Sequence, residues 1–159
     1  MILVTVGTQL PFPRLIDAME RIAAETGERV VAQTGPVSGR GQGAWPHLDQ
    51  RPTLAPAEFD ALFKEARVVV AHAGIGSILS ARRHRRPLVI LPRRHALGEH
   101  RNDHQLATAR AVAKLPGIHV AWQADELGPI LARELDPAGE GGSASRDALI
   151  ARLKEFIEA

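Results

Sequence analysis

Apolar residues in this chain fall into two kinds of segment that alternate along its length. Short, largely apolar runs, which predict buried strands, cover residues 2–6, 29–34, 67–71, 88–91 and 117–122. Segments with apolar residues three or four positions apart, which predict helices, cover residues 14–25, 56–66, 76–84, 102–114 and 124–135. A brief extended piece is also expected within residues 51–55. Largely apolar strands that alternate with helices predict an α/β fold, a parallel sheet with helices on both faces.

The predicted elements divide the chain into one domain and a C-terminal extension. The domain covers residues 1–137, a size that suits a single core. Residues 138–144 predict a flexible linker, and residues 145–159 predict a final helix with Ser145 as its N-cap. Inside the domain, residues 35–47 hold four glycines and two prolines, which predict a long loop.

Composition narrows the possible classes of function. Because the chain has no cysteine, disulfides, thiolate catalysis and cysteine-bound zinc are excluded. Aromatic residues make up only 4%, so few side chains are available to stack on the bases of a single-stranded nucleic acid. No apolar run approaches the ~20 residues of a membrane span, and the first residues form a strand without a basic leader. We therefore expect a cytoplasmic protein without a signal peptide.

Arginine supplies most of the positive charge, although the net charge is only +2. The clustered arginines are Arg82, Arg83, Arg85, Arg86, Arg93, Arg94 and Arg101. Such a cluster suits a phosphate group, an anionic lipid or an acidic partner, and it also suits a solvated helix face. The low net charge argues against a nucleic-acid binder.

The strand predicted at residues 67–71 ends in a turn that suits an anion. After His72, Gly74 and Gly76 lack a Cβ atom, so backbone N–H groups can approach a ligand closely. A helix then begins and points its free N–H groups and positive dipole end at the same place. Ser77 can cap this helix or donate to a phosphate oxygen. A tight turn with an N-cap explains the same pattern, so the turn alone leaves both interpretations open.

Standard nucleotide-binding and hydrolase motifs do not fit this turn. It lacks the third glycine of the dinucleotide fingerprint and the Gly-Lys-Ser/Thr of a P-loop. Ser77 lies in no Gly-x-Ser-x-Gly elbow, so a hydrolase triad is not indicated.

A second polar loop, with the sequence GEHRNDHQ, covers residues 98–105. This density of hydrogen-bonding side chains favours recognition of a sugar or phosphate, because an ordinary loop rarely needs so many. Helix capping on a polar surface is one alternative. A metal site is another, and its possible ligands are His95, His100, Asp103 and His104, whose spacing matches no standard zinc pattern.

Four stretches of the sequence carry a family resemblance: VTVGT at 4–8, HAGIGSIL at 72–79, RPLVILPR at 86–93 and LGEHRNDHQLATA at 97–109. Together they resemble the C-terminal, donor-binding domain of family 28 glycosyltransferases, over about residues 1–125. Stand-alone subunits that consist of this half alone are still more similar. They are the PssE/EpsF-type exopolysaccharide subunits and the soluble subunit of the eukaryotic dolichol-diphosphate N-acetylglucosamine transferase. The resemblance implies the Rossmann-like C-terminal half of a GT-B glycosyltransferase.

The resemblance also implies roles for particular residues. The residues expected to bind a nucleotide sugar are Gly7, Thr8, His72, Gly74, Ile75, Gly76, Ser77, Arg93, Glu99, His100, Asp103 and Gln105. Residues 74–77 would hold the diphosphate of a UDP-sugar, and residues 86–93 with those just after them would border the uracil, mainly through backbone groups. Asp103 and Gln105, which match the family's Asp-x-Gln pattern, would contact hydroxyls of the donor sugar.

One departure from the family concerns the ribose. Ser80 stands where many relatives carry a carboxylate that grips the ribose hydroxyls, so ribose binding is weaker or Glu99 takes this role. His72, or an arginine of the 93–101 loop, is expected to add positive charge as UDP departs. We assign no catalytic base, and we expect neither a metal nor a cofactor.

The resemblance implies half of an enzyme. We expect the donor-binding catalytic subunit of a two-component, UDP-sugar-dependent hexosyltransferase that acts on a lipid-linked acceptor in exopolysaccharide synthesis. It would be inactive alone and active with a membrane-anchored, PssD-like partner, which recruits it to the inner face of the cytoplasmic membrane. The Arg-rich residues 82–86 and the final helix are candidate partner surfaces. The alternatives are a non-catalytic nucleotide-sugar sensor and, less well supported, a nucleic-acid binder.

Overall fold

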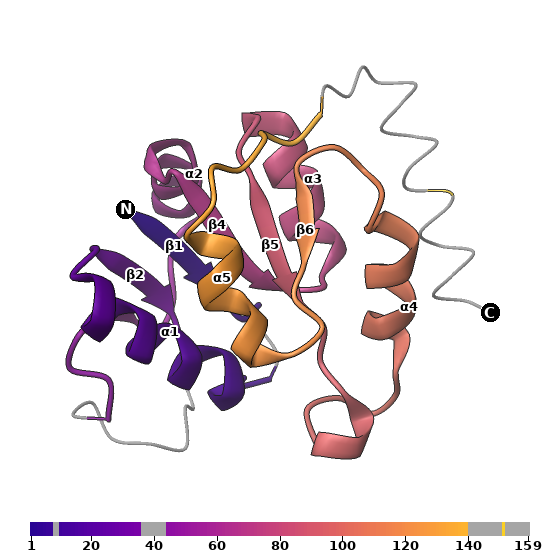
Figure 1. The fold of residues 1–159 in the computed structure, drawn as a ribbon, viewed down its shortest axis with the longest axis horizontal. Coiled ribbons are helices and arrows are strands. Elements are labelled where there is room, and N and C mark those ends of the chain that lie inside the picture. The colour runs from indigo at the N-terminus through magenta and orange to yellow at the C-terminus, as the bar shows by residue number, and fades with distance from the viewer. Residues whose placement is uncertain (8–9, 36–43, 140–150, 152–159) are drawn as a thin grey trace.

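A computed structural model describes residues 1–7, 10–35, 44–139 and 151 of the chain (Figure 1). Its strands form one sheet in the order β3-β2-β1-β4-β5-β6, and every pair of neighbours is parallel. The strands are β1 (Ile2–Thr5), β2 (Val30–Gln33), β3 (Asp49–Arg51), β4 (Val68–His72), β5 (Leu88–Leu91) and β6 (Ile118–Val120). The predicted parallel α/β fold is therefore confirmed, and its strand order is that of a Rossmann fold.

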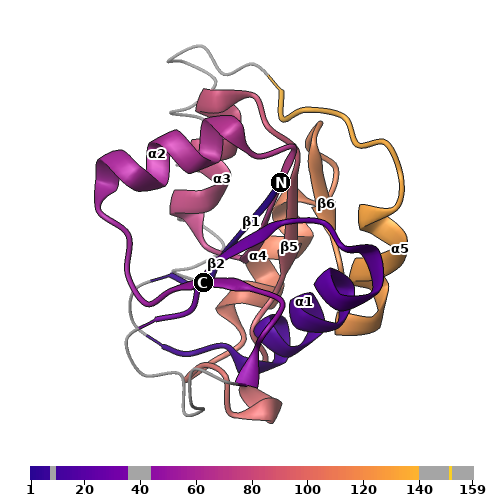
Figure 2. The same ribbon diagram turned by 90° about the vertical axis from the view of Figure 1, so that its left-hand side faces the viewer.

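Helices cover both faces of the sheet. The α-helices are α1 (Pro13–Thr26), α2 (Pro56–Glu65), α3 (Ile75–His84), α4 (His104–Val112) and α5 (Leu127–Leu131). Two short 3-10 turns, η2 (His95–Leu97) and η3 (Ala124–Glu126), lie in the connections. Buried residues of α1 and α5 share one core cluster, and those of α2, α3 and α4 share the other. Figure 2 shows α1 and α5 on one side of the sheet and α2 and α3 on the other.

β1, β2, β4 and β5 are largely apolar because most of their side chains enter one of these two clusters. In β1, Ile2 and Val4 belong to the cluster with α1, whereas Leu3 between them belongs to the cluster with α3. All three are fully buried. This alternation within a strand explains why the sequence shows continuous apolar runs instead of an amphipathic pattern.

Two predicted helices are shorter than expected. The helix predicted over 124–135 is split into η3 and the five-residue α5. Pro129 has no N–H group to donate to the carbonyl of Asp125, so the α-helical hydrogen bonds do not continue from η3 into α5. The helix predicted from residue 102 begins at His104. Before it, the Asn102 side chain accepts a hydrogen bond from the His104 N–H group, a turn that competes with the helix.

The strand order produces a switch point between β1 and β4. The chain leaves β1 through α1 toward β2 on one side, and it leaves β4 through α3 toward β5 on the other. The connecting helices at such a point diverge and leave a crevice at the carboxyl ends of the two strands. The residues that follow β1 and end β4 at this edge include Gly7 and His72.

The last described segment of the domain crosses the opposite edge of the sheet. The Ala138 N–H group donates to the Arg86 carbonyl at 3.3 Å, and the Gly139 N–H group donates to the Pro116 carbonyl at 3.1 Å. Ala138 is 3% exposed. The first two residues of the predicted linker therefore pack against the domain. The rest of the linker, and all of the predicted final helix except residue 151, lie outside the described residues.

Replacing Gly117 by alanine should lower the free energy of unfolding by about 3 kcal/mol. Gly117 has φ +78°, and a Cβ atom there would lie 2.2 Å from the Ala138 backbone, so the 136–139 segment would be displaced. Gly27→Ala is the matched control, because Gly27 has φ +71° but no neighbour within 4 Å of its Cβ position. The control should cost only about 1 kcal/mol. Equal losses in urea denaturation would contradict this packing.

Candidate functional site

A cavity of about 640 Å³ opens at the carboxyl edge of the sheet, at the switch point. It is lined by Thr5, Val6, Gly7, Leu10, Gln33, Thr53, Leu54, Pro56, Phe59, His72, Gly74, Ile75, Gly76, Ser77, Ser80, Arg93, His100 and Gln105. This volume lies within the range of about 300–1,000 Å³ that is usual for small-molecule sites. The walls come from the carboxyl ends of β1, β2 and β4 and from the segments that follow β1, β3, β4 and β5.

The N-terminus of α3 supplies anion-binding groups to this cavity. Gly74 is the N-cap, and no side chain caps the helix. The N–H groups of the first helical residues, Ile75 to Ser77, have no acceptor four residues earlier within the helix. These N–H groups lie in the cavity wall, at the positive end of the helix dipole. This part of the wall can therefore bind a negatively charged ligand.

The three glycines around this turn have different steric roles. A Cβ atom on Gly74 would lie 2.6 Å from His72 Cε1, and one on Gly7 would lie 2.8 Å from His72 Nε2. These two glycines therefore make room for the imidazole ring. A Cβ atom on Gly76, which also lines the cavity, would meet no protein atom within 4 Å.

His72 is partly buried between these loops and carries no charge at neutral pH. Burial, and then the nearby Arg93 and His100, lower the pKa of His72 to about 4. Gln105 Nε2 lies 2.9 Å from His72 Nδ1. The neutral ring can offer a hydrogen bond, but in this environment it does not supply the positive charge that the sequence analysis expected.

The low pKa of His72 predicts a specific dependence of stability on pH. Between pH 6.5 and 4 the unfolded histidine binds a proton and the folded one does not, so stability is complete above pH 6.5 and falls as the pH drops toward 4. The loss should reach about 3 kcal/mol. Urea denaturation of the wild type and His72→Gln at several pH values measures it, because the variant lacks this contribution. Parallel pH profiles would refute it.

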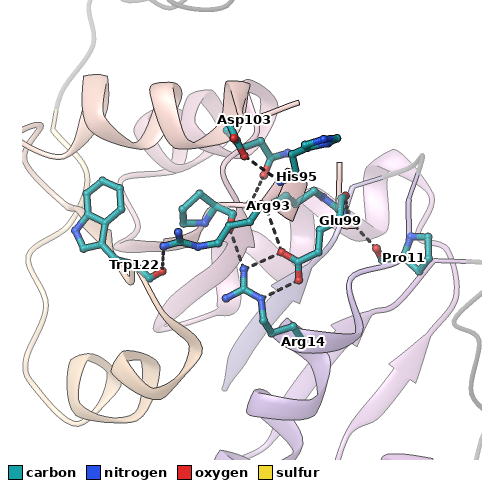
Figure 3. A network of polar contacts seen from close by, with 10 residues as sticks. Pro11, Arg14, Arg93, His95, Glu99, Asp103 and Trp122 are labelled. Atoms are coloured by element: carbon teal, nitrogen blue, oxygen red, sulfur yellow. Dashed lines mark hydrogen bonds and ion pairs between the residues drawn. The ribbon is translucent and has the colours of Figure 1, made fainter. Parts of the chain in front are cut away.

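Arg93 is 2% exposed, and its guanidinium faces backbone carbonyl groups (Figure 3). It donates to the carbonyl oxygens of Val6 at 2.6 Å, Leu10 at 2.8 Å, Pro11 at 2.7 Å and Glu99 at 3.4 Å. Burial lowers the pKa of Arg93 to about 10, so the group stays charged at neutral pH. The sequence predicted a ligand contact, whereas these donors brace the loop after β1 and leave a fixed positive charge in the cavity wall.

Glu99 is engaged elsewhere and does not line the cavity. Its two carboxylate oxygens accept hydrogen bonds from Arg14 at 2.8 and 2.9 Å, and one of them also accepts from the Arg94 N–H group at 3.0 Å. Figure 3 shows this carboxylate turned toward Arg14 on α1. The structure therefore does not support Glu99 as a substitute for the ribose carboxylate, whereas Ser80 does line the cavity.

The two residues of the Asp-x-Gln pattern lie in different surroundings. Asp103 accepts a hydrogen bond from the His95 N–H group at 2.9 Å and is not part of the cavity wall. Gln105 is 8% exposed and lines the cavity. Of the expected binding residues, the structure brings together Gly7, His72, Gly74, Ile75, Gly76, Ser77, Arg93, His100 and Gln105. Thr8 lies outside the described residues.

The sequence model of the glycosyltransferase family 28 C-terminal domain matches residues 1–117. The chain belongs to this family. No curated protein sequence matches it significantly. The family membership and the parallel Rossmann-like sheet together identify the C-terminal domain of a glycosyltransferase.

Solved structures share the fold of this family 28 domain. The NMR structure of ALG13 superposes with a TM-score of 0.67 at 18% identity, over 99% of this chain and 96% of that one. The glycosyltransferase of kitacinnamycin gives 0.63 at 21% identity, and UDP-glucose: anthocyanidin 3-O-glucosyltransferase in complex with UDP gives 0.59 at 17%. Each covers 99% of this chain, which spans 38% and 36% of their lengths.

Some residues of the cavity wall were not predicted from the sequence. The loop between β3 and α2 contributes Thr53, Leu54, Pro56 and Phe59 to the wall. Residues 86–93, which were expected to border the uracil, contribute only Arg93 to the described wall. The β3–α2 loop reaches the cavity because β3 ends at the same edge of the sheet, so the order of parallel strands was the available signal.

Gln33 is a second residue that the sequence analysis missed. It ends β2 and is 7% exposed. Its Oε1 accepts from the Thr5 hydroxyl at 2.8 Å and from the Val6 N–H group at 3.2 Å, and its Nε2 donates to the carbonyls of Gly7 and Pro52. Gln33 thus ties the loop after β1 to the loop after β3. A buried amide at the end of a strand is the pattern that would have indicated it.

Two other expectations concern charge and metals. The predicted arginine cluster is divided, because Arg82 to Arg86 lie where α3 ends, whereas Arg93 follows β5 at the opposite edge of the sheet.

Within the described ranges, no three His, Asp or Glu side chains converge as a possible metal site. Over the same part of the chain, no helix has both the length and the apolar character that crossing a bilayer requires.

Proposed function

We propose that the cavity binds a UDP-sugar and that the chain is the donor-binding catalytic subunit of a two-component hexosyltransferase. The observation that carries this proposal is the N-terminus of α3, which no side chain caps and where Gly76 lines a cavity of about 640 Å³. Free amides at a helix N-terminus suit a diphosphate. Membership of family 28 supports an activated sugar as the ligand.

The residues that line the cavity suit each part of this ligand. The diphosphate lies against residues 75–77, at the N-terminus of α3. The base packs against the apolar side chains of Leu54, Pro56 and Phe59 in the cavity wall, and the Ser80 hydroxyl is available to the ribose. The sugar then points toward His100 and the loop after β5. A structural neighbour crystallised in complex with UDP supports a uridine nucleotide.

In the transfer step, an acceptor hydroxyl attacks the anomeric carbon while the bond to the diphosphate oxygen breaks. The leaving UDP takes the electron pair, and its added negative charge is stabilised by the amides of residues 75–77 and by the fixed charge of Arg93. This stabilisation needs no metal. The base that removes the acceptor proton belongs to the acceptor half.

In this proposal a partner protein supplies the half of the enzyme that binds the acceptor. The chain corresponds to somewhat under two fifths of two larger glycosyltransferases, and to nearly the whole of ALG13. A membrane-anchored, PssD-like subunit with a lipid-linked acceptor, acting in exopolysaccharide synthesis, would complete the active site. It would also bring the chain to the inner face of the cytoplasmic membrane.

Calorimetry tests the donor site directly. UDP, UDP-glucose and UDP-N-acetylglucosamine are titrated into the chain with and without EDTA, and ADP and a single-stranded oligonucleotide serve as controls. We expect the uridine diphosphates to bind equally well with EDTA, and the controls to bind weakly or not at all. Preferential binding of the oligonucleotide would favour the nucleic-acid interpretation and refute the proposal.

A transfer assay tests the catalytic part. Sugar transfer to a lipid-linked acceptor is measured for the chain alone, for the co-expressed membrane partner alone and for the two together. Activity only in the combination is the expected result. Full turnover by the isolated chain would exclude a two-component enzyme. Binding of UDP-sugars without transfer under any condition would indicate the alternative function, a non-catalytic nucleotide-sugar sensor.

A further inference from the structure

Both ends of the Gln105 side-chain amide make hydrogen bonds to groups of the protein. Its Oε1 accepts hydrogen bonds from the Ala73 N–H group at 3.2 Å and from the Arg93 N–H group at 3.0 Å. Two backbone donors on one atom identify that atom as the oxygen. The NH₂ end of the amide must therefore be the end that lies 2.9 Å from His72 Nδ1.

This orientation determines which nitrogen of His72 carries the proton. An NH₂ group can only donate, so Nδ1 of His72 must be an acceptor without a proton. The neutral ring then has its proton on Nε2. The Nε2 edge lies toward Gly7 and Gly74, both in the cavity wall, where no side chain intervenes because neither residue has a Cβ atom.

His100, the second histidine of the cavity, has its proton on the other ring nitrogen. Asn102 Oδ1 accepts the His104 N–H group at 3.0 Å and lies 3.1 Å from His100 Nδ1. Because an oxygen can only accept, His100 Nδ1 carries the proton, and the Nε2 of its neutral form is an acceptor. Two different amide side chains thus give the two histidines opposite protonation patterns, so the tautomer of His72 depends on Gln105 specifically.

We propose that Gln105 is a positioning residue, which holds His72 as an Nε2–H donor toward the bound nucleotide sugar, where it donates to a diphosphate oxygen. The identity of the ligand rests on the proposed function, whereas the protonation pattern of His72 does not. In this arrangement the Gln105 oxygen has both acceptor positions occupied, so a sugar hydroxyl in the cavity would meet only the second N–H of its amide. Besides Gln105, the groups that act on the His72 ring are Arg93 and His100, and both disfavour a second proton on it.

The first test needs neither a ligand nor a variant that changes the network. Long-range ¹H–¹⁵N correlation spectra of the wild-type chain report the tautomer of each of its seven histidines. The His72 signals are identified by their loss in His72→Gln. At pH 7 we expect a protonated Nε2 and an unprotonated Nδ1 for His72. A proton on Nδ1 would overturn the inference, even if the chain binds UDP.

A pair of variants tests whether Gln105 is the cause. In Gln105→Glu, both carboxylate oxygens are acceptors, so a proton should move onto His72 Nδ1. Asn102→Asp is the matched control, because it adds the same charge nearby but presents the same kind of acceptor to His100, and His72 should keep its wild-type pattern. An unprotonated Nδ1 in folded Gln105→Glu would contradict the proposal.

Binding of UDP-glucose connects the tautomer to the ligand. Near pH 8, His72 of the Gln105→Glu variant would be neutral with its proton on Nδ1, so its Nε2 would present a lone pair to the diphosphate. The affinity of this variant for UDP-glucose should therefore be at least tenfold below that of Asn102→Asp. The difference should shrink at lower pH, where the His72 ring becomes doubly protonated. Equal affinities at every pH would refute the link between His72 and the ligand. If the wild type bound no UDP-glucose, the proposed function would fail while the tautomer result stood.

Discussion

Gly76→Ala should make the chain more stable and should weaken its binding of UDP at least tenfold. Alanine is favoured over glycine inside a helix by about 0.5–1 kcal/mol, and the new Cβ would meet no protein atom within 4 Å. The same methyl group would occupy the space beside the α3 amides in which we place the diphosphate. A gain in stability combined with a loss of affinity is therefore specific to a ligand at this position.

Calorimetry with UDP and urea denaturation measure the two effects of Gly76→Ala. Gly128→Ala is the matched control, since Gly128 lies in α5, has no neighbour within 4 Å of its Cβ position and does not line the cavity. It should gain stability and keep its affinity. Gly74→Ala would be a poor test, because its Cβ would displace His72. Unchanged UDP affinity in Gly76→Ala would show that the diphosphate does not lie on this turn.

The fold was predictable because the strands and helices carry local signals. Continuous apolar runs marked the strands that the structure buries on both faces, and α1 and α2 begin with the prolines that suit a first helical turn. The same signals located the glycine turn after β4. The predicted length of a helix was wrong where glycine and proline interrupt the apolar spacing. At Gly128 and Pro129, the helix expected over 124–135 is reduced to α5.

The site was only partly predictable, because the state of its side chains depends on distant residues. Glu99 was a reasonable ligand group until the fold placed Arg14, 85 residues earlier, against its carboxylate. His72 was one of the groups expected to add positive charge, whereas burial in the folded chain, together with Arg93 and His100, lowers its pKa and leaves it neutral. Nothing in the local sequence of either residue records these partners, whereas the order of the parallel strands brings them together.

The remaining large effect concerns Arg93. Arg93→Met should lower the free energy of unfolding by about 4 kcal/mol, because the variant leaves several buried carbonyl groups without their donor. The carbonyls of Val6, Leu10 and Pro11 belong to the loop after β1. Because that loop forms one wall of the cavity, UDP affinity should fall as well. Urea denaturation and calorimetry measure the two losses.

Two neighbouring variants separate the possible causes of these losses. Arg94→Met removes one carbonyl contact, to Trp122 at 2.7 Å, and should cost only about 1 kcal/mol. Arg93→Lys keeps the charge but loses the planar fork that reaches several carbonyls, so its stability should approach that of Arg93→Met while its UDP affinity stays higher. If Arg93→Lys matched the wild type in stability, the charge alone would matter and the bracing of the loop after β1 would be disproved.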